Sequence, residues 1–148
     1  MGLADIIAQF IASKIEDTEG TLELSRGELA GRFGCVPSQI NYVLTTRFTP
    51  EHGYVVETKR GGGGYIRITR VRLTPTALIM HAVNSVGHEL DPRTAAAFLQ
   101  NLTDALPDEA LRAIAAAVSE TALRDAPAAL RDRVRARIFK QCLLVTLL

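Results

Sequence analysis

The residues best suited to bind a polyanion lie around a run of glycines in the first half of the chain. Lys59 and Arg60 stand directly before this run, and Tyr65 follows it. Because glycine has no Cβ, a glycine tip can adopt positive φ and lie close against a flat surface. A thin tip with two cations suits a groove walled by phosphates, and the alternative is a loop whose cations are merely solvated. The glycines are Gly61, Gly62, Gly63 and Gly64.

A second set of polar side chains lies just upstream, in a segment that Pro37 opens as a helix. Short amide and hydroxyl side chains pair with base edges and phosphates, whereas a solvated helix face usually carries Lys and Glu. The alternative is a neutral surface helix with ordinary polar residues. The predicted buried stripe is Val36, Ile40, Val43 and Leu44, and the polar side chains off it are Ser38, Gln39, Asn41, Tyr42 and Thr45.

The elements that must position these two sets can be predicted from the surrounding pattern. Alternating residues in 53–58 and 65–71 predict a β-hairpin with the glycines at its tip. Upstream, residues 3–17 have helical apolar spacing and Thr21–Leu24 alternates like a short strand. Ser25 and Glu28 form a capping-box pattern that opens a helix ending at Phe33. The order helix, strand, helix, helix, strand, strand predicts a winged helix-turn-helix.

Charge is unevenly distributed along the chain. The whole chain has a net charge of +1, but residues 41–72 hold six basic and two acidic side chains, a local balance of +4. The local field matters more to a polyanion than the total charge does. We therefore expect a positive surface around the hairpin.

These residues carry a specific resemblance to a known family. The run Cys35-Val36-Pro37-Ser38-Gln39-Ile40-Asn41-Tyr42-Val43, together with Lys59-Arg60, the four glycines and Tyr65-Ile66-Arg67-Ile68, closely resembles the CtsR family of bacterial class III stress-gene repressors. The motif match covers about Ser25 to Val71. The glycine wing combined with the VPSQINYV run is more specific than either motif alone.

The resemblance implies a homodimeric repressor of Clp protease and chaperone genes that binds a directly repeated heptanucleotide operator. It implies a recognition helix at Ser38–Arg47 in the major groove and a wing in the minor groove, with Arg60 as the key arginine. It also implies heat sensing by the wing, and control by a protein-arginine kinase and Clp-dependent degradation. The residues predicted to contact DNA are Arg26, Ser38, Gln39, Asn41, Tyr42, Thr45, Arg47, Lys59, Arg60, Gly61, Gly62, Gly63, Gly64 and Tyr65.

The second half of the chain reads as four short helices. Thr74-Pro75, Asp91-Pro92, Pro107 and Pro127 mark the starts, and the end from Leu143 to Leu148 is strongly apolar. We predict domains at 1–73 and 74–148, the second a four-helix dimerisation domain; a monomeric bundle with a buried tail is the alternative. In the last helix we expect an apolar stripe of Leu130, Val134, Ile138, Cys142 and Val145, and a solvated face with Arg131, Arg133, Arg135, Arg137 and Lys140.

Other function classes have little support in the sequence. His52, His81 and His88 lack metal-binding spacing, Cys35 and Cys142 form no CxxC pair, and there is no nucleophile elbow. We expect no enzyme activity, no metal and no cofactor. No apolar run approaches the roughly 20 residues of a membrane span, so we expect a cytoplasmic protein without a membrane partner. Two other interpretations stay open: a ligand-responsive winged-helix regulator, although the C-terminal helices offer almost no buried polar cluster, and an interaction-only protein.

Overall fold

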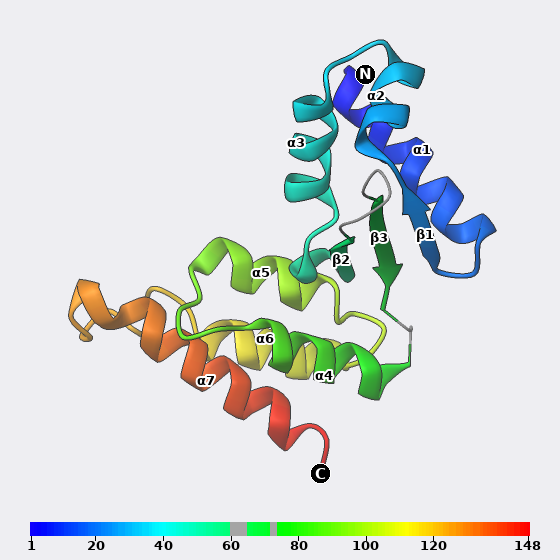
Figure 1. Cartoon of the computed structure of the whole chain (residues 1–148). Helices are drawn as coiled ribbons and strands as arrows, with labels where there is room; N and C mark the ends of the chain where they lie inside the picture. Colours follow the sequence, from blue (N-terminus) through cyan, green and yellow to red (C-terminus); the bar gives the residue numbers. More distant parts are fainter. Residues whose placement is uncertain (60–64, 72–73) are drawn as a thin grey trace. The chain divides into compact units, whose positions relative to one another are not determined.

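The computed structural model describes residues 1–59, 65–71 and 74–148, and the chain separates into two compact units, Met1–Val71 and Arg72–Leu148 (Figure 1). The first unit is the α/β part and the second is helical. A mainly helical chain with one small sheet is the fold class that the sequence predicts.

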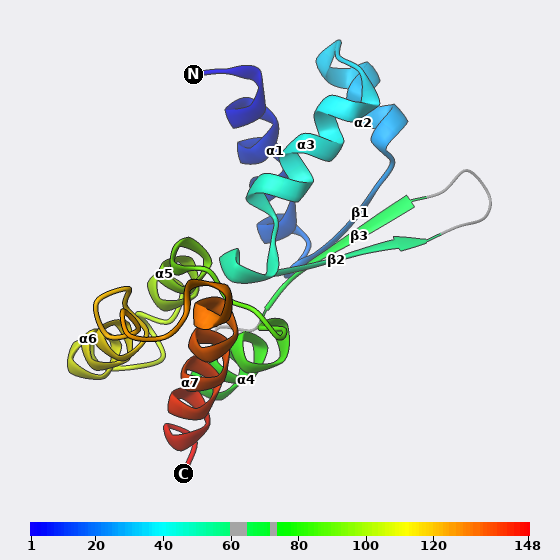
Figure 2. The ribbon, with the colours of Figure 1, turned by 90° about the vertical axis from the view of Figure 1, so that its left-hand side faces the viewer.

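The first unit has the winged helix-turn-helix order. It consists of α1 (Leu3–Asp17), β1 (Thr21–Leu24), α2 (Arg26–Phe33), α3 (Pro37–Arg47), the 3-10 turn η1 (Pro50–His52), β2 (Tyr54–Lys59) and β3 (Tyr65–Arg70). The strands form one antiparallel sheet in the order β1-β3-β2. Figure 2 shows this sheet with the three helices of the unit gathered on the same side of it.

The core of the first unit lies between the helices and the sheet. α1 contributes Ile7, Ile11 and Ile15, and β3 contributes Ile66 and Ile68, each at most 1% exposed. α3 adds three further buried side chains, and Leu29, Ala30 and Phe48 complete the cluster. Period-2 alternation in β3 places its isoleucines inward and Arg67 outward, so the sheet has one buried face. The buried side chains of α3 are Ile40, Val43 and Leu44.

The turn between α2 and α3 follows from local chemistry. The Ser25 hydroxyl accepts a hydrogen bond from the Glu28 amide at 3.4 Å, which confirms one half of the predicted capping box. The described hydrogen bonds include none from the Ser25 amide to the Glu28 carboxylate, so the other half is not formed. Gly34 has φ +64°, the left-handed conformation that ends α2. The predicted burial of Val36 is wrong, since its side chain is 63% exposed. Val36 is the N-cap of α3 and has an extended backbone, so the helical spacing does not apply to it.

The second unit contains α4 (Pro75–Ser85), α5 (Pro92–Gln100), α6 (Asp108–Ala117), the 3-10 turn η2 (Ala128–Leu130) and α7 (Arg131–Val145). Two predicted caps are present: the Thr74 hydroxyl accepts from the Ala77 amide at 3.3 Å, and the Asp91 carboxylate accepts from the Thr94 amide at 2.8 Å. Pro127 precedes the 3-10 turn, and the last α-helix begins at Arg131.

The prediction of which side chains of α7 are buried and which are exposed is wrong at several positions. The buried side chains are Ala136, Phe139, Leu143 and, with 0% exposure, Arg135. Leu130 and Val145, expected in the apolar stripe, are 42% and 63% exposed.

Arg135 is tolerated inside the second unit because its guanidinium is fully engaged. It donates to the backbone oxygens of Val118 at 2.8 Å and Leu90 at 3.0 Å. It also forms ion pairs with Asp132 and Glu120. A buried charge persists only when it is paired and hydrogen-bonded, and Arg135 meets both conditions. Arg135 therefore belongs to the core rather than to the solvated face, and its two carboxylate partners, Glu120 and Asp132, are about half exposed.

Candidate nucleic-acid interface

The polar side of α3 is accessible along its length. Ser38, Asn41, Tyr42 and Thr45 are exposed, and Gln39 is half-buried. Tyr42 is 55% exposed although it is a large ring. The opposite side of α3 is fixed in the core of the first unit, so the polar side has a rigid support. The structure thus brings the five predicted side chains of this helix onto its outer surface.

Two hydroxyls of α3 are directed back to their own helix. The Thr45 hydroxyl donates to the Asn41 carbonyl at 3.0 Å, and the Thr46 hydroxyl donates to the Tyr42 carbonyl at 2.7 Å. With its proton engaged in this way, the Thr45 oxygen can still accept a hydrogen bond. In this conformation Thr45 is suited to a base amino group rather than to a phosphate.

Arg47 ends α3 and bonds to α1. Its Nη2 lies 2.7 Å from the Asp5 Oδ1, and both side chains are more than 40% exposed. The hydrogen bond from Arg47, followed by one from the Gly2 amide, holds the pKa of Asp5 below its ordinary value. Sequence reasoning placed Arg47 among the DNA contacts and missed Asp5, which lies 42 residues away in the chain. In the structure Arg47 links the end of α3 to α1.

The base of the hairpin is described on both strands. Lys59, the last residue of β2, pairs in register with Tyr65, the first residue of β3. The Lys59 ammonium lies 3.3 Å from the Glu57 carboxylate, and Tyr65 is 37% exposed. The structure therefore brings Lys59 and Tyr65 side by side. The remaining predicted wing residues, Arg60, Gly61, Gly62, Gly63 and Gly64, lie outside the described residues.

Arg26 occupies the first position of α2 and is half-buried. Its Nε is buried and has no hydrogen-bond partner in the described part of the chain. A buried donor without an acceptor costs about 1–3 kcal/mol, so native structures rarely leave one unpaired. An acceptor supplied by a bound molecule would remove that cost.

The expected local balance of +4 overstates the free positive charge. Arg67 bonds to Glu23 at 3.0 Å, and Arg70 lies 3.8 Å from Glu16, both acids outside the segment that was counted. The Glu23 carboxylate raises the pKa of Arg67 above its ordinary value. The whole first unit has eight basic and eight acidic side chains. The strand register explains the omission, because Glu23 lies directly opposite Arg67 in the antiparallel pair.

The described residues offer neither a metal site nor a membrane-spanning helix. Among residues 1–59, 65–71 and 74–148, no group of three or more His, Cys, Asp or Glu side chains is placed to hold a metal ion. None of the helices formed by these residues is both long and apolar enough to cross a membrane.

Comparison with known proteins gives consistent results. The family model of the CtsR N-terminal HTH domain matches residues 2–72. The transcriptional regulator CtsR of Staphylococcus haemolyticus is 41% identical over 145 residues, covering 95% of this chain and 94% of its own. That of Staphylococcus saprophyticus is 42% identical with the same coverage. Among solved structures, the crystal structure of CtsR in complex with a 26bp DNA duplex matches with a TM-score of 0.75, 35% identity and 97% coverage of each chain.

The similarity extends beyond the helix-turn-helix motif. The relatives cover the helical second unit as well as the first. They are transcriptional regulators rather than enzymes, which agrees with the expectation from the sequence. The motif resemblance is therefore confirmed along nearly the full length, and the chain belongs to the CtsR family of transcriptional regulators.

Proposed function

We propose that this protein is a sequence-specific DNA-binding repressor of stress-response genes, including Clp protease and chaperone genes. The observation that carries the proposal is the exposed amide and hydroxyl face of α3 in the same unit as the antiparallel strand pair β2 and β3. That arrangement occurs in a chain whose full length resembles a CtsR solved with a DNA duplex. Because the site of action is DNA, we place the protein in the cytoplasm.

In this proposal α3 reads the major groove. Ser38 and Gln39 lie in the first turn of α3, where helices of this type enter the groove. Asn41 comes next to the buried Ile40 in the sequence and is exposed. Asn and Gln amides can bind the N6 and N7 of adenine bidentately, and each good pair discriminates against a wrong base by about 1–3 kcal/mol. Tyr42 and Thr45 extend the same surface, and Arg47 contacts phosphate or positions the helix through Asp5.

The wing enters the minor groove in this proposal. Lys59 and Tyr65 lie at its described base, and Arg60 and Gly61–Gly64 are the residues between them in the sequence. An arginine inserted into a narrow minor groove gains from its enhanced negative potential. Ordering a glycine tip costs about 1–2 kcal/mol per residue of backbone entropy, a cost that grows with temperature. Release of the operator on heating follows if the tip is ordered by DNA.

We further propose that residues 1–73 bind DNA and residues 74–148 form a homodimer. Val145 is 63% exposed and Leu148 is fully exposed at the end of the second unit. An apolar terminus of this kind favours burial against a second copy. A dimer would place one DNA-binding unit on each repeat of a directly repeated heptanucleotide operator.

We also propose, from the family resemblance alone, two regulatory partners, a protein-arginine kinase and the Clp protease. Phosphorylation of an arginine on the DNA face would replace a cation by an anion and repel the duplex. The alternative interpretation, a ligand-responsive regulator, gains little from the buried Arg135 of the second unit, because its guanidinium already bonds to protein acceptors.

The proposal is tested by footprinting the purified protein on the region upstream of the Clp genes of its own genome at two temperatures. We expect protection of two directly repeated half-sites at the lower temperature and its loss at the higher one, while circular dichroism still shows a folded protein. Asn41→Ala should weaken the protection, and Asn84→Ala, an exposed asparagine of α4, is the matched control. Equal protection of operator and unrelated DNA would contradict sequence-specific repression.

A further inference from the structure

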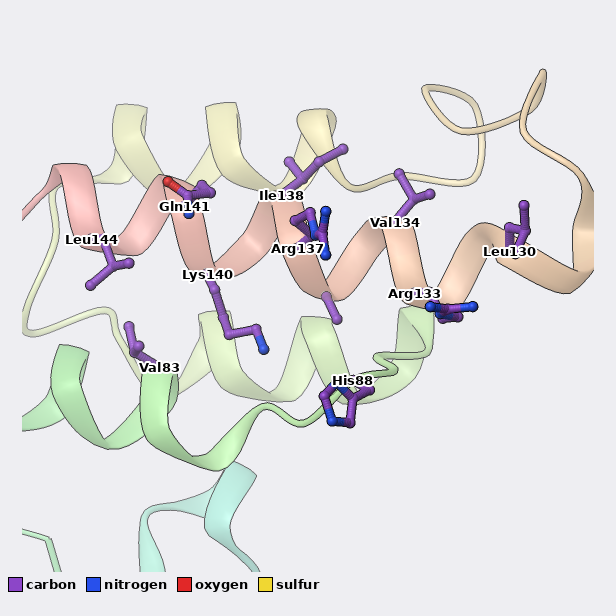
Figure 3. A pocket seen from close by; sticks show the side chains of 11 residues that line it. Val83, His88, Leu130, Arg133, Val134, Arg137, Ile138, Lys140, Gln141 and Leu144 are labelled. Atoms are coloured by element: carbon purple, nitrogen blue, oxygen red, sulfur yellow. The ribbon is translucent and has the colours of Figure 1, made fainter.

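A basic and apolar groove runs along the outer side of α7 in the second unit, and no residue of the proposed DNA interface belongs to it. Its volume is about 610 Å³, and we call it the α7 groove (Figure 3). Val83 near the end of α4 and His88 beyond it form one wall. Figure 3 shows the other lining side chains on Leu130 of η2 and along α7, with Leu130, Val134 and Ile138 on one side of the helix and Lys140 and Leu144 on the side nearer Val83.

The apolar side chains that line the α7 groove are only partly covered. Val83, Val134 and Ile138 are half-buried, and Leu130 and Leu144 are 42% and 39% exposed. Leu130, Val134 and Ile138 recur every four residues, so they form one continuous row along the helix. From Leu130 to Leu144 the helical rise is about 21 Å. That length matches about four turns of a second helix and exceeds the reach of a compact metabolite.

The rim of the groove is positive. Arg133, Arg137 and Lys140 line it, together with His88, and no acidic side chain does. The Lys140 ammonium donates to the Gly87 carbonyl at 2.9 Å. Arg133 and Arg137 form no ion pair with any residue in the described ranges, whereas Arg131 and Arg135 on the same helix are both paired with Glu120. The groove therefore holds two uncompensated guanidiniums beside an apolar row.

We propose that the α7 groove is a docking site for an acidic amphipathic helix of a partner protein. The apolar stripe of that helix would cover Val134, Ile138 and Leu144, as in helix-in-groove recognition. Arg133 and Arg137 are one helical turn apart, so carboxylates at i and i+4 of the partner would reach both guanidiniums. Charge complementarity would set the orientation and the rate of docking.

Other occupants fit less well. A second copy placed on this groove by a two-fold axis would bring the same patch against itself, so that Arg133, Arg137 and Lys140 would face like charges. DNA would leave the apolar row without a partner, because phosphate contacts come from charged and polar groups. The exposed apolar end at Val145 and Leu148, on which the proposed dimer rests, is not part of the groove lining.

The test uses the full-length protein and a designed probe. The probe is a fluorescein-labelled 18-residue peptide with leucine at every third or fourth position and glutamate on both sides of that stripe. The first control is a peptide of the same composition in scrambled order. Fluorescence anisotropy is measured at physiological salt for the wild-type protein, for the double variant Arg133→Glu/Arg137→Glu and for the matched control Arg93→Glu/Arg112→Glu, two exposed arginines outside the groove.

We expect the ordered peptide to bind with micromolar affinity and the scrambled one not to bind. The groove variant should weaken binding by roughly tenfold or more, because it replaces two attractions by two repulsions, and the control pair should change it by less than about twofold. Methyl resonances of Val134, Ile138 and Leu144 should shift on titration. The proposal would be overturned if the ordered peptide did not bind, or if it bound the groove variant as well as the wild type. It would also be overturned if light scattering showed that the charge reversal at Arg133 and Arg137 abolishes a homodimer. DNA footprints are read separately, so failure here leaves the repressor proposal intact.

Discussion

Replacing Arg135 with leucine should selectively destabilise the second unit. The substitution leaves the buried carbonyl oxygens of Val118 and Leu90 without their donor. An unsatisfied buried acceptor costs about 1–3 kcal/mol, and breaking a buried ion pair typically costs about 3–5 kcal/mol. Glu120 and Asp132 are about half exposed, so water can solvate them after the change. We therefore expect a loss of about 3–5 kcal/mol, a large part of the stability of a small domain.

The positions of the tyrosines make this prediction measurable unit by unit. Tyr42, Tyr54 and Tyr65 all lie in the first unit and the chain has no tryptophan, so tyrosine fluorescence reports on the first unit alone. Urea unfolding followed by circular dichroism at 222 nm reports on both units. In Arg135→Leu the helical transition of the second unit should move to lower urea, and the tyrosine transition should stay in place.

The matched control for Arg135 is Arg133→Leu, which changes an exposed arginine on the same helix and should alter stability by less than about 0.5 kcal/mol. A loss below about 1 kcal/mol in Arg135→Leu, or one equal to that of the control, would refute the assignment of the guanidinium to the core. A parallel shift of the tyrosine signal would refute its confinement to the second unit.

Three further outcomes follow from the contacts. Asp91→Ala removes the N-cap of α5 and should cost about 1 kcal/mol in urea unfolding, with Asp104→Ala, an exposed carboxylate, as the control. Hydrogen bonds hold the pKa of Asp5 and of Asp91 below their ordinary value, so they stabilise the fold fully above about pH 4. This stabilisation is lost as the pH falls through the lower folded pKa. In acid titration, Asp5→Asn should therefore lose less unfolding free energy than the wild type. Gly34→Ala should cost about 1 kcal/mol through its left-handed φ alone, because no atom lies within 4 Å of the added Cβ; an equal cost for Gly31→Ala, in the helix, would contradict that cause.

Periodicity predicted the first unit well because its signals are local. The alternation of β3, the glycine after α2 and the proline at the start of α3 each specify backbone geometry within a few residues. The ion pairs around the hairpin were not predictable in this way. Glu23 and Arg67 are 44 residues apart, and only the register of β1 against β3 places them together.

The second unit shows where a helical pattern is ambiguous. α7 has apolar residues on two sides, since Val134 and Ile138 continue a row that begins at Leu130 of η2, while Phe139 and Leu143 form another. Spacing alone could not decide which row faces the core. Which row faces the core depends on the burial of Arg135, and its partners Val118, Leu90 and Glu120 are distant in the chain. An arginine counts as a surface residue in a sequence until such partners are known.

The claim that a helix and a wing hold one duplex from two grooves is tested most directly by dimethyl sulfate protection on the operator. This reagent methylates guanine N7 in the major groove and adenine N3 in the minor groove, so one experiment reports both contacts. At equal occupancy, Asn41→Ala should weaken the guanine N7 protections beside the adenine that its amide is proposed to bind and keep the adenine N3 protections, whereas Arg60→Ala should lose the adenine N3 protections and keep the guanine ones. If the wild-type protein leaves adenine N3 unprotected in both half-sites, or if the two variants lose the same set of protections, the account is contradicted.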